Sequence, residues 1–158
     1  MKIIIKRAHK KDWLKLAKLH HDFRRFHFKI IDKISRKFRI FEAPYLQVTF
    51  KRILRDKKKL YLVAICGKEI IGFAIAEIAH KKYQEVKVVE GTIARLYVTK
   101  KFRGKGVSTL LLKRIQHWFN AKKVKYVDIC VLAKNIKAMD VYKKWGFKPF
   151  VVVMQKAF

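Results

Sequence analysis

The chain has 158 residues and carries 40 Lys and Arg against 11 Asp and Glu, which gives a formal charge of +29 at pH 7. Hydrophobic residues make up 51% and aromatic residues 13%, a composition that excludes a disordered chain and predicts one domain over residues 1–158. No apolar run approaches the ~20 residues that span a bilayer, so a membrane-spanning protein is excluded as well.

Apolar patterns in the first half of the chain predict a strand, helices and a hairpin. The strand covers residues 2–6, and an apolar stripe between His9 and Ile34 is typical of one or two amphipathic helices. Pro44 lies near the expected start of a further helix, which ends near Arg55. Two apolar runs, over 60–66 and 70–78, are joined by the turn Gly67-Lys68-Glu69 and predict a β-hairpin.

The second half of the chain alternates strands and helices. We expect a polar connection over 80–85, strands over 86–98, 125–132 and 148–155, and helices over 109–119 and 136–144. The order β-αα-βββ-α-β-α-β predicts an α+β domain with a mixed, mostly antiparallel sheet. A strand–helix–strand crossover in the second half adds a parallel pair to that sheet.

The first residues and the two cysteines indicate in which cellular compartment the protein is found. The start of the chain, Met1–Arg7, has too short an apolar core for a signal peptide and is typical of a first strand. Cys66 and Cys130 both lie in apolar, strand-like runs, so we expect buried thiols in a reducing environment. The sequence therefore predicts a cytoplasmic protein. Either a monomer or a homodimer is expected.

The excess of basic residues has two explanations. The first explanation is a function that requires association with a polyanion such as RNA, DNA or the ribosome. The excess is also compatible with a compositional bias of the source organism: the low content of Asn and Gln suits a thermophile, although so few acidic residues do not suit its ion-pair networks. The sequence leaves both explanations open.

A glycine-rich corner, Arg103-Gly104-Lys105-Gly106-Val107-Ser108, connects the strand over 86–98 to the next helix. Two glycines let the backbone approach a ligand, and a helix start offers unpaired amides and a partial positive charge, so phosphate is the expected ligand. A Walker loop is excluded because its Gly-x-x-x-x-Gly-Lys-Ser/Thr pattern is absent. A dinucleotide-binding fingerprint requires a third glycine where this chain has Thr109, and a solvated glycine turn is the structural alternative.

A second pattern, Asn135-x-x-Ala138-x-x-x-Tyr142-Lys143-Lys144-Trp145-Gly146-Phe147, begins where the strand over 125–132 ends. Asn135 is suited to cap the next helix and Gly146 to end it. Tyr142 follows Asn135 by two helical turns, so both side chains address the same side. A core aromatic with no chemical role is the alternative for Tyr142.

Together, the two patterns resemble the GCN5-related N-acetyltransferase (GNAT) superfamily. Its members carry an Arg/Gln-x-x-Gly-x-Gly/Ala loop after the fourth strand and an Asn-x-x-Ala-x-x-x-Tyr-x-x-x-Gly-Phe segment after the fifth. Here these segments are residues 103–108 and 135–147, and the predicted elements follow the family's order over essentially the whole chain. Ser108 departs from the pattern, but serine is small and its hydroxyl can donate to a phosphate oxygen. The resemblance implies the GNAT fold, in which strands four and five splay apart.

The resemblance also implies that acetyl-CoA is the co-substrate and that its acetyl group passes to a primary amine. It places the diphosphate at the amides from Gly104 through Lys105, Gly106 and Val107 to Ser108, with charge from Arg103 and Lys105. It places the pantetheine arm along Leu96, Tyr97 and Val98, where a backbone amide near Leu96 polarises the thioester carbonyl. Asn135 is expected to bind the cofactor arm or a water molecule.

The same resemblance assigns acid and base roles. Tyr142 maps to the general acid that protonates the departing CoA thiolate, which a phenol can do within hydrogen-bond reach of the sulfur. Glu90 is the candidate base for the attacking amine, with a solvated strand-end carboxylate as its alternative role and Glu77 as a second candidate. No metal is expected, because the six histidines and two cysteines form no group with metal-site spacing.

The acceptor is not identified, and a protein N-terminus, a lysine side chain and a small-molecule amine are all compatible with the sequence. The positive charge disfavours free polyamines, which it repels, and favours acidic peptide termini, ribosome-bound substrates or anionic metabolites.

The alternative function is a basic nucleic-acid- or ribosome-associated module that keeps the fold without catalysis. The basic and aromatic run Phe23–Lys29 fits the nucleic-acid-binding surface of such a module but fits a buried helix face better.

Overall fold

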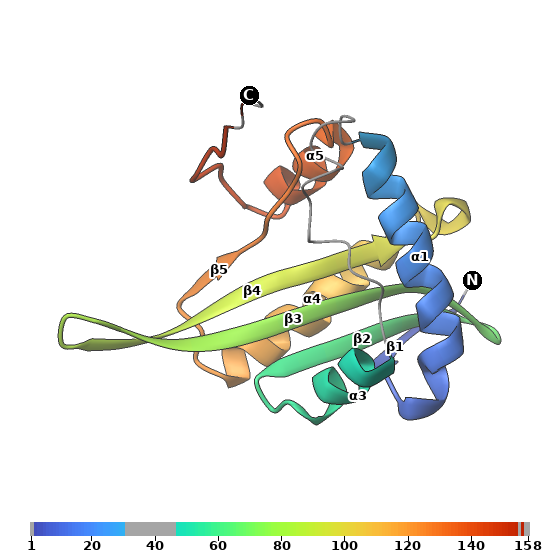
Figure 1. Cartoon of the computed structure of the whole chain (residues 1–158), viewed down its shortest axis with the longest axis horizontal. Helices are drawn as coiled ribbons and strands as arrows, with labels where there is room; N and C mark the ends of the chain where they lie inside the picture. Colours follow the sequence, from blue (N-terminus) through green and yellow to red (C-terminus); the bar gives the residue numbers. More distant parts are fainter. Residues whose placement is uncertain (1, 31–46, 155, 157–158) are drawn as a thin grey trace.

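The computed structural model describes residues 2–30, 47–154 and 156 (Figure 1). The strands are β1 (Ile3–Arg7), β2 (Lys59–Cys66), β3 (Glu69–Tyr83), β4 (Val86–Val98) and β5 (Tyr126–Asp128). The α-helices are α1 (Trp13–Ile30), α3 (Gln47–Arg55), α4 (Val107–Ala121) and α5 (Ile136–Lys144), and the short 3-10 helices are η1 (Lys10–Asp12) and η3 (Lys100–Phe102). None of the described helices has both the length and the apolar character needed to cross a bilayer.

The strands form one sheet in the order β1-β2-β3-β4-β5. The first four strands pair antiparallel, and β5 pairs with the edge of β4 in parallel. Because a parallel pair requires a crossover connection, α4 lies between these two strands in the chain. The predicted α+β fold with a mixed, mostly antiparallel sheet is therefore confirmed.

Helices cover both faces of the sheet, α4 behind it and α1 and α3 in front of it in the view of Figure 1. The core on the α4 face contains Leu62, Ala74, Ile93, Leu111 and Ile115. The core on the opposite face contains Leu16, Phe50, Val63, Phe73 and Ile75. Neighbouring residues of β2 and β3 thus enter different cores, which explains why both strands are continuous apolar runs in the sequence.

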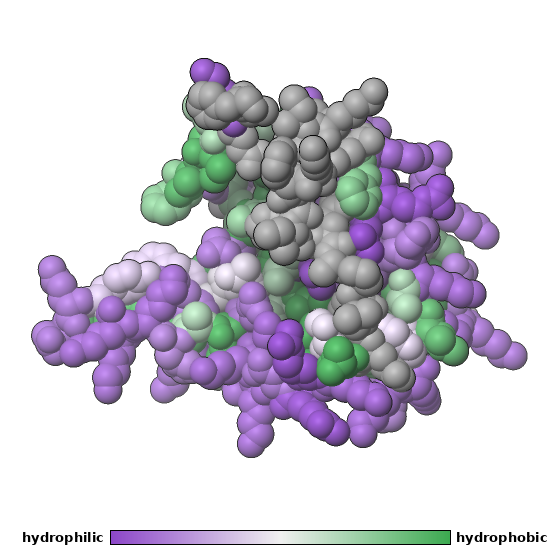
Figure 2. All heavy atoms as spheres, viewed as in Figure 1, coloured by the Kyte–Doolittle hydropathy of each residue, from purple (hydrophilic) through white to green (hydrophobic). Residues whose placement is uncertain are grey.

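β3 and β4 continue as a long hairpin beyond the body of the sheet, so the polar connection predicted over 80–85 is wrong. The ladder runs on through Tyr83, and the turn is only Gln84-Glu85. Charge pairing across the ladder takes the place of apolar burial, with Lys81 Nζ 2.6 Å from Glu90 Oε2. The arm projects to the left in Figure 1, and its surface is mostly hydrophilic in Figure 2.

The end of the chain differs most from the prediction. β5 has only three residues within the span 125–132, and the described residues of the segment 148–155 form no strand. An additional strand needs a partner with several backbone groups to bond, and so short a β5 offers few. The side chains from Phe150 to Met154 are 72–97% exposed and form the apolar patch at the upper left of Figure 2.

Two further expectations concern helix limits and cysteines. The part of the helical stripe from residue 31 to Ile34, and the helix start near Pro44, lie outside the described residues. The prediction of buried thiols is wrong for Cys130, which is exposed, while Cys66 is half-buried. The reason is the short β5, since Cys130 follows a strand whose three residues are all exposed.

His20 is a buried polar residue at the centre of the α1 face, with 2% of its surface exposed. Its Nε2 forms a 2.6 Å hydrogen bond with the Tyr61 hydroxyl, and its ring centroid lies 4.1 Å from that of Phe73. Burial, with a smaller contribution from the positive charge of Arg95, lowers the pKa of His20 from 6.5 to about 3. The imidazole is therefore neutral in the folded protein at all but strongly acidic pH.

We expect His20 to make the protein sensitive to acid. Above pH 6.5 the imidazole is neutral in both the folded and the unfolded chain. Between pH 6.5 and about 3 the unfolded chain binds a proton that the folded chain excludes, which lowers the free energy of unfolding by up to ~1.4 kcal/mol per pH unit.

Denaturant unfolding at pH 7 and pH 5 tests this expectation. His20→Gln should lose less stability between the two pH values than the wild type, and His21→Gln, at the exposed neighbouring position, should behave as the wild type. NMR of the imidazole nitrogens gives a second measurement on the wild type alone. A His20 ring that takes up its proton near pH 6 in the folded protein would contradict the assignment.

Candidate active site

β4 and β5 separate after a short parallel pairing. Their ladder consists of Glu90↔Tyr126, Gly91↔Val127 and Thr92↔Asp128. Beyond Thr92, β4 continues along β3 as far as Val98, so its other edge has no strand partner among the described residues. Such an edge presents unpaired backbone N–H and C=O groups. The separation confirms the predicted splay of the fourth and fifth strands and leaves Leu96, Tyr97 and Val98 on the free edge.

A β-bulge interrupts β4 close to the start of this free edge. Ile93 pairs with Ala76 and Arg95 pairs with Ile75, which leaves Ala94 without a partner on β3. Ala94 is exposed, although the residues on both sides of it are buried or half-buried. Bulges bend a strand and redirect its side chains and amides. The bulge depends on the register of two strands, and no sequence pattern indicated it.

The glycine corner lies between the end of β4 and the start of α4. Gly104 and Gly106 have left-handed backbone, with φ of 73° and 75°, and Gly106 is the N-cap of α4. A Cβ built on either glycine would meet nothing within 4 Å, so both face open space. Val107 is buried and anchors the helix start, and Ser108 follows in the first turn. The corner therefore combines accessible backbone with the positive end of a helix dipole, as phosphate binding requires.

The side chain of Arg103 folds onto β4 and α1. Its Nε donates a hydrogen bond to the Val98 carbonyl at 3.0 Å. Its guanidinium carbon lies 4.8 Å from the ring centroid of Phe26 and 5.6 Å from that of Tyr97. In this arrangement Arg103 ties the corner to the neighbouring elements, and the exposed Lys105 is the cation next to the glycines.

Helix α5 has the bounds that the sequence predicts, Ile136–Lys144, with both expected residues at its ends. The carbonyl of Asn135 accepts hydrogen bonds from the amides of Ala138 and Met139, but its side chain makes no capping bond. Gly146 has a φ of 87° and follows the end of the helix. The Asn135 side chain thus has no capping role that would compete with a ligand.

Tyr142 is half-buried among aromatic residues at the end of α5. Its ring centroid lies 5.7 Å from that of Trp145 and 6.3 Å from that of Phe147. Both of these rings pack against the core of the α4 face. Burial raises the pKa of Tyr142 above its usual range, so the phenol keeps its proton at neutral pH. A protonated phenol is the form that a general acid needs.

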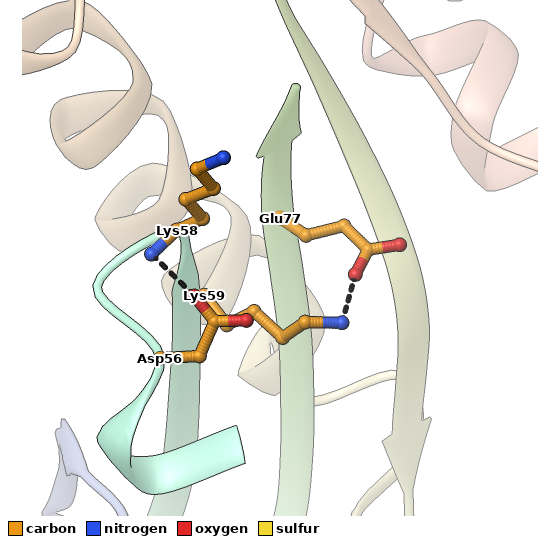
Figure 3. A network of polar contacts seen from close by, with 4 residues as sticks. All are labelled: Asp56, Lys58, Lys59 and Glu77. Atoms are coloured by element: carbon orange, nitrogen blue, oxygen red, sulfur yellow. Dashed lines mark hydrogen bonds and ion pairs between the residues drawn. The ribbon is translucent and has the colours of Figure 1, made fainter. Parts of the chain in front are cut away.

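The two candidate bases have different surroundings. Both oxygens of Glu90 are engaged, Oε1 by the Tyr83 hydroxyl at 2.5 Å and Oε2 by Lys81 Nζ at 2.6 Å. Hydrogen bonds from Lys81 and then Tyr83 lower the pKa of the Glu90 carboxyl. Glu90 also lies six residues before Leu96, roughly 20 Å along the strand. Glu77, on β3, forms an ion pair with Lys59 of the neighbouring strand β2 (Figure 3).

The run Phe23–Lys29 belongs to the packing of α1 on the sheet. The ring centroid of Phe23 lies 6.1 Å from that of Phe73 and 5.9 Å from that of Tyr97. Phe23 joins the core of the α1 and α3 face, and Phe26 and Phe28 are half-buried. The apolar residues of the run are therefore half-buried against the protein, with Phe23 on the core, and they do not form an exposed aromatic platform.

The acetyltransferase (GNAT) family model matches residues 16–147, which include the free edge of β4, the glycine corner and α5. The chain belongs to the acetyltransferase (GNAT) family. A curated relative from Bacillus subtilis subsp. natto, named "probable spermine N(1)-acetyltransferase", is 27% identical to this GNAT chain over 112 residues. The matched part covers 68% of this chain and 73% of that relative.

Solved structures share the fold of this GNAT protein. A tetramutant of a protein from Bacillus halodurans has a TM-score of 0.85 at 22% identity, and the match covers 98% of this chain and 99% of that one. AAC(6')-Iy, in complex with the bisubstrate analogue CoA-S-monomethyl-acetylneamine, has a TM-score of 0.71 at 18% identity, and the match covers 100% of both chains. At sequence identities this low, the comparison with these structures shows a shared fold and nothing about substrates.

The site fits acetyl-CoA, which the GNAT family uses. The open space in front of Gly104 and Gly106 suits a diphosphate, and the free edge of β4 offers backbone groups to the amides of a pantetheine arm. Within residues 2–30, 47–154 and 156, no three His, Cys, Asp or Glu side chains are grouped to hold a metal ion.

Proposed function

We propose that this GNAT protein is an acetyl-CoA-dependent N-acetyltransferase that transfers the acetyl group to a primary amine by direct attack in a ternary complex. The observation that carries the proposal is the free edge of β4, which begins after Thr92 and leads to the left-handed glycines of the corner. Two comparisons support an amine acceptor: the name of the Bacillus subtilis relative and the acetylneamine part of the analogue bound to AAC(6')-Iy.

The chain would hold acetyl-CoA, which supplies the activated acetyl group, at two places. Leu96, Tyr97 and Val98 would hold the pantetheine arm along the free edge through backbone groups other than the Val98 carbonyl, which already accepts a hydrogen bond from Arg103 Nε. The amides from Gly104 to Ser108, with Lys105 and the dipole of α4, hold the diphosphate. Arg103 supports the corner through its contacts with β4 and α1.

The catalytic groups would lie around the fork between β4 and β5. A backbone amide near Leu96, next to the bulge, polarises the thioester carbonyl. Tyr142 donates its proton to the leaving sulfur, which its raised pKa permits at neutral pH. Asn135 binds the cofactor arm or a water molecule. Glu90 as the base stays a prediction, and its two bonded oxygens do not favour it.

The acceptor proposed here is an amine whose surroundings are neutral or acidic. The formal charge of +29 repels free polyamines, in spite of the name of the Bacillus subtilis relative. The same charge attracts an acidic peptide terminus, a ribosome-bound substrate or an anionic metabolite, and such an acceptor would be concentrated at the protein surface.

A panel of amines, with release of the CoA thiol as the signal, tests the function. The panel contains spermine, lysine, an aminoglycoside and a peptide with an acidic N-terminal sequence, and the peptide is expected to react faster than spermine. Calorimetry should show binding of acetyl-CoA, and its absence would refute the proposal. No thioester cleavage, together with RNA binding that weakens steeply with salt, would instead show a basic binding module that keeps the fold without catalysis.

A further inference from the structure

We propose that Glu77 on β3 is the proton acceptor for the attacking amine, an inference that rests on the proposed N-acetyltransferase function. Glu77 is the register partner of Thr92 on β4. Thr92 is also the last residue of β4 that pairs with β5, opposite Asp128. Glu77 therefore lies beside the point where the two strands separate and the expected acetyl-CoA edge begins.

Glu77 and Thr92 face the side of the sheet that α1 and α3 cover. Ile75, two residues before Glu77, belongs to the core on that side, whereas Ile78 and Ile93 belong to the core on the α4 side. Because side chains alternate along a strand, Glu77 and Thr92 share the face of Ile75. Figure 3 shows the Glu77 side chain extending from β3 toward β4. The carboxylate thus points to the strand that carries the reacting end of the site.

A pocket of about 300 Å³ opens beside this carboxylate. Its lining residues are Asp56, Lys58, Lys59, Glu77, Ile78, Ala79 and Thr92. A water molecule takes ~30 Å³ in the liquid, so the pocket has room for several waters or for part of an acceptor. A proton can therefore move from an amine to Glu77 directly or through ordered water.

The charges around the pocket leave one oxygen of Glu77 accessible. Oε2 pairs with Lys59 Nζ at 2.5 Å, while Oε1 has no hydrogen-bond partner among the described residues. The other carboxylate of the pocket, Asp56, accepts a hydrogen bond from the Lys58 amide at 2.8 Å. Glu90, in contrast, has both oxygens bonded. Glu77 is therefore the better proton acceptor of the two candidates.

Position along β4 favours Glu77 as well. Its partner Thr92 lies four residues before Leu96, about 13 Å along the strand, against roughly 20 Å for Glu90. The bulge at Ala94 lies between Thr92 and Leu96 and bends this part of the strand. Water in the pocket would relay the proton over the remaining distance.

Two protons leave the acceptor nitrogen in the proposed reaction. The acceptor ammonium gives one proton to Glu77, and the nitrogen lone pair forms the C–N bond to the acetyl carbon. The C–S bond breaks, its electron pair stays on sulfur, and the sulfur takes the proton of Tyr142. The Tyr142 phenolate takes the second proton from nitrogen, and Glu77 releases the first to solvent. The net products are the amide, CoA thiol and one proton.

Glu77→Gln tests the role with the best amine of the panel. We expect kcat/KM for that amine to fall by about a hundredfold or more and the acidic limb of its pH profile to disappear. Hydroxylamine, which is already unprotonated at neutral pH, should be acetylated at nearly the wild-type rate. Glu85→Gln is the matched control, because Glu85 Oε2 also pairs with a lysine, Lys82, at 3.1 Å. It should leave both reactions unchanged.

Lys59→Met separates proton transfer from a structural effect, since it breaks the same ion pair but keeps the carboxylate. It should retain most of the turnover, and a loss as large as that of Glu77→Gln would overturn the proposal. Two measurements are independent of turnover. Acetyl-CoA affinity by calorimetry should be equal in the wild type and Glu77→Gln, and the 13C NMR signal of the Glu77 carboxylate should move when the amine is added.

The possible failures are distinguishable. A wild-type protein that binds no acetyl-CoA and releases no CoA with any amine refutes the N-acetyltransferase function itself. A wild-type protein that turns over, with equal kcat/KM and an equal pH profile in Glu77→Gln, refutes only the role of Glu77. Loss of the acidic limb in Glu90→Gln but not in Glu77→Gln would return the role to Glu90.

Discussion

Replacing Tyr142 by Phe is expected to lower kcat about a hundredfold, because the variant cannot donate a proton to the leaving sulfur. The ring and its contacts with Trp145 and Phe147 remain, so acetyl-CoA affinity and thermal stability should stay close to those of the wild type. Rates of CoA release at saturating acetyl-CoA and amine, with calorimetry for binding, measure both effects.

The dependence of kcat on pH also tests the role of Tyr142 as the acid. The acid acts in its protonated form, and burial raises the pKa of Tyr142 above the usual range, so kcat should decline only at pH values above those at which an exposed tyrosine ionises. Tyr142→Phe should remove this decline along with most of the rate. Tyr126→Phe, at a 71% exposed position on β5, is the control and should change neither. Full turnover by Tyr142→Phe would show that another group protonates the sulfur.

The second large effect is expected at the corner. Gly106→Ala places a Cβ in the open space in front of the backbone and imposes a left-handed conformation that costs an L-residue about 1–2 kcal/mol. Because a diphosphate would occupy that space, we expect acetyl-CoA affinity to fall by about tenfold or more, equivalent to ~1.4 kcal/mol. Calorimetry of acetyl-CoA binding measures the loss.

Gly67→Ala separates the contact with the ligand from backbone strain. Gly67 has a φ of 58° in the β2–β3 turn, and a Cβ there also meets nothing within 4 Å. Both variants should therefore lose similar stability in denaturant unfolding, while only Gly106→Ala should bind acetyl-CoA weakly. Equal acetyl-CoA affinity in the two variants would mean that the diphosphate does not lie against Gly106.

Features that depend on neighbouring residues in the sequence were predicted well. The bounds of α5 follow from a cap-type residue, a 3.6-residue apolar period and a glycine, and the structure has the same bounds. The glycine corner also lies where the sequence predicts it, between β4 and α4, and the structure adds that Gly104 and Gly106 have left-handed backbone. Such signals are contained in short segments, so they survive without knowledge of the fold.

Features that depend on pairing between distant residues were missed. The hairpin arm has polar residues that are typical of a loop, yet cross-strand bonds and the pair Lys81–Glu90 extend it as a ladder. The segment from Phe150 to Met154 has the composition of a strand but lacks a partner edge among the described residues. In both cases the partner, and not the segment's own composition, decides the structure.

The sequence by itself determined the family resemblance, the glycine corner as the expected phosphate site and Tyr142 as the expected acid, because each is a short pattern with its own physical reason. The tertiary structure alone decided where β4 leaves β5, that a bulge lies at Ala94, and that Arg103 contacts Phe26 and Tyr97. It also brought Glu77 opposite Thr92, which reverses the order of the two candidate bases. The reason is that strand register and side-chain contacts join residues that are far apart in the chain, and no local pattern specifies them.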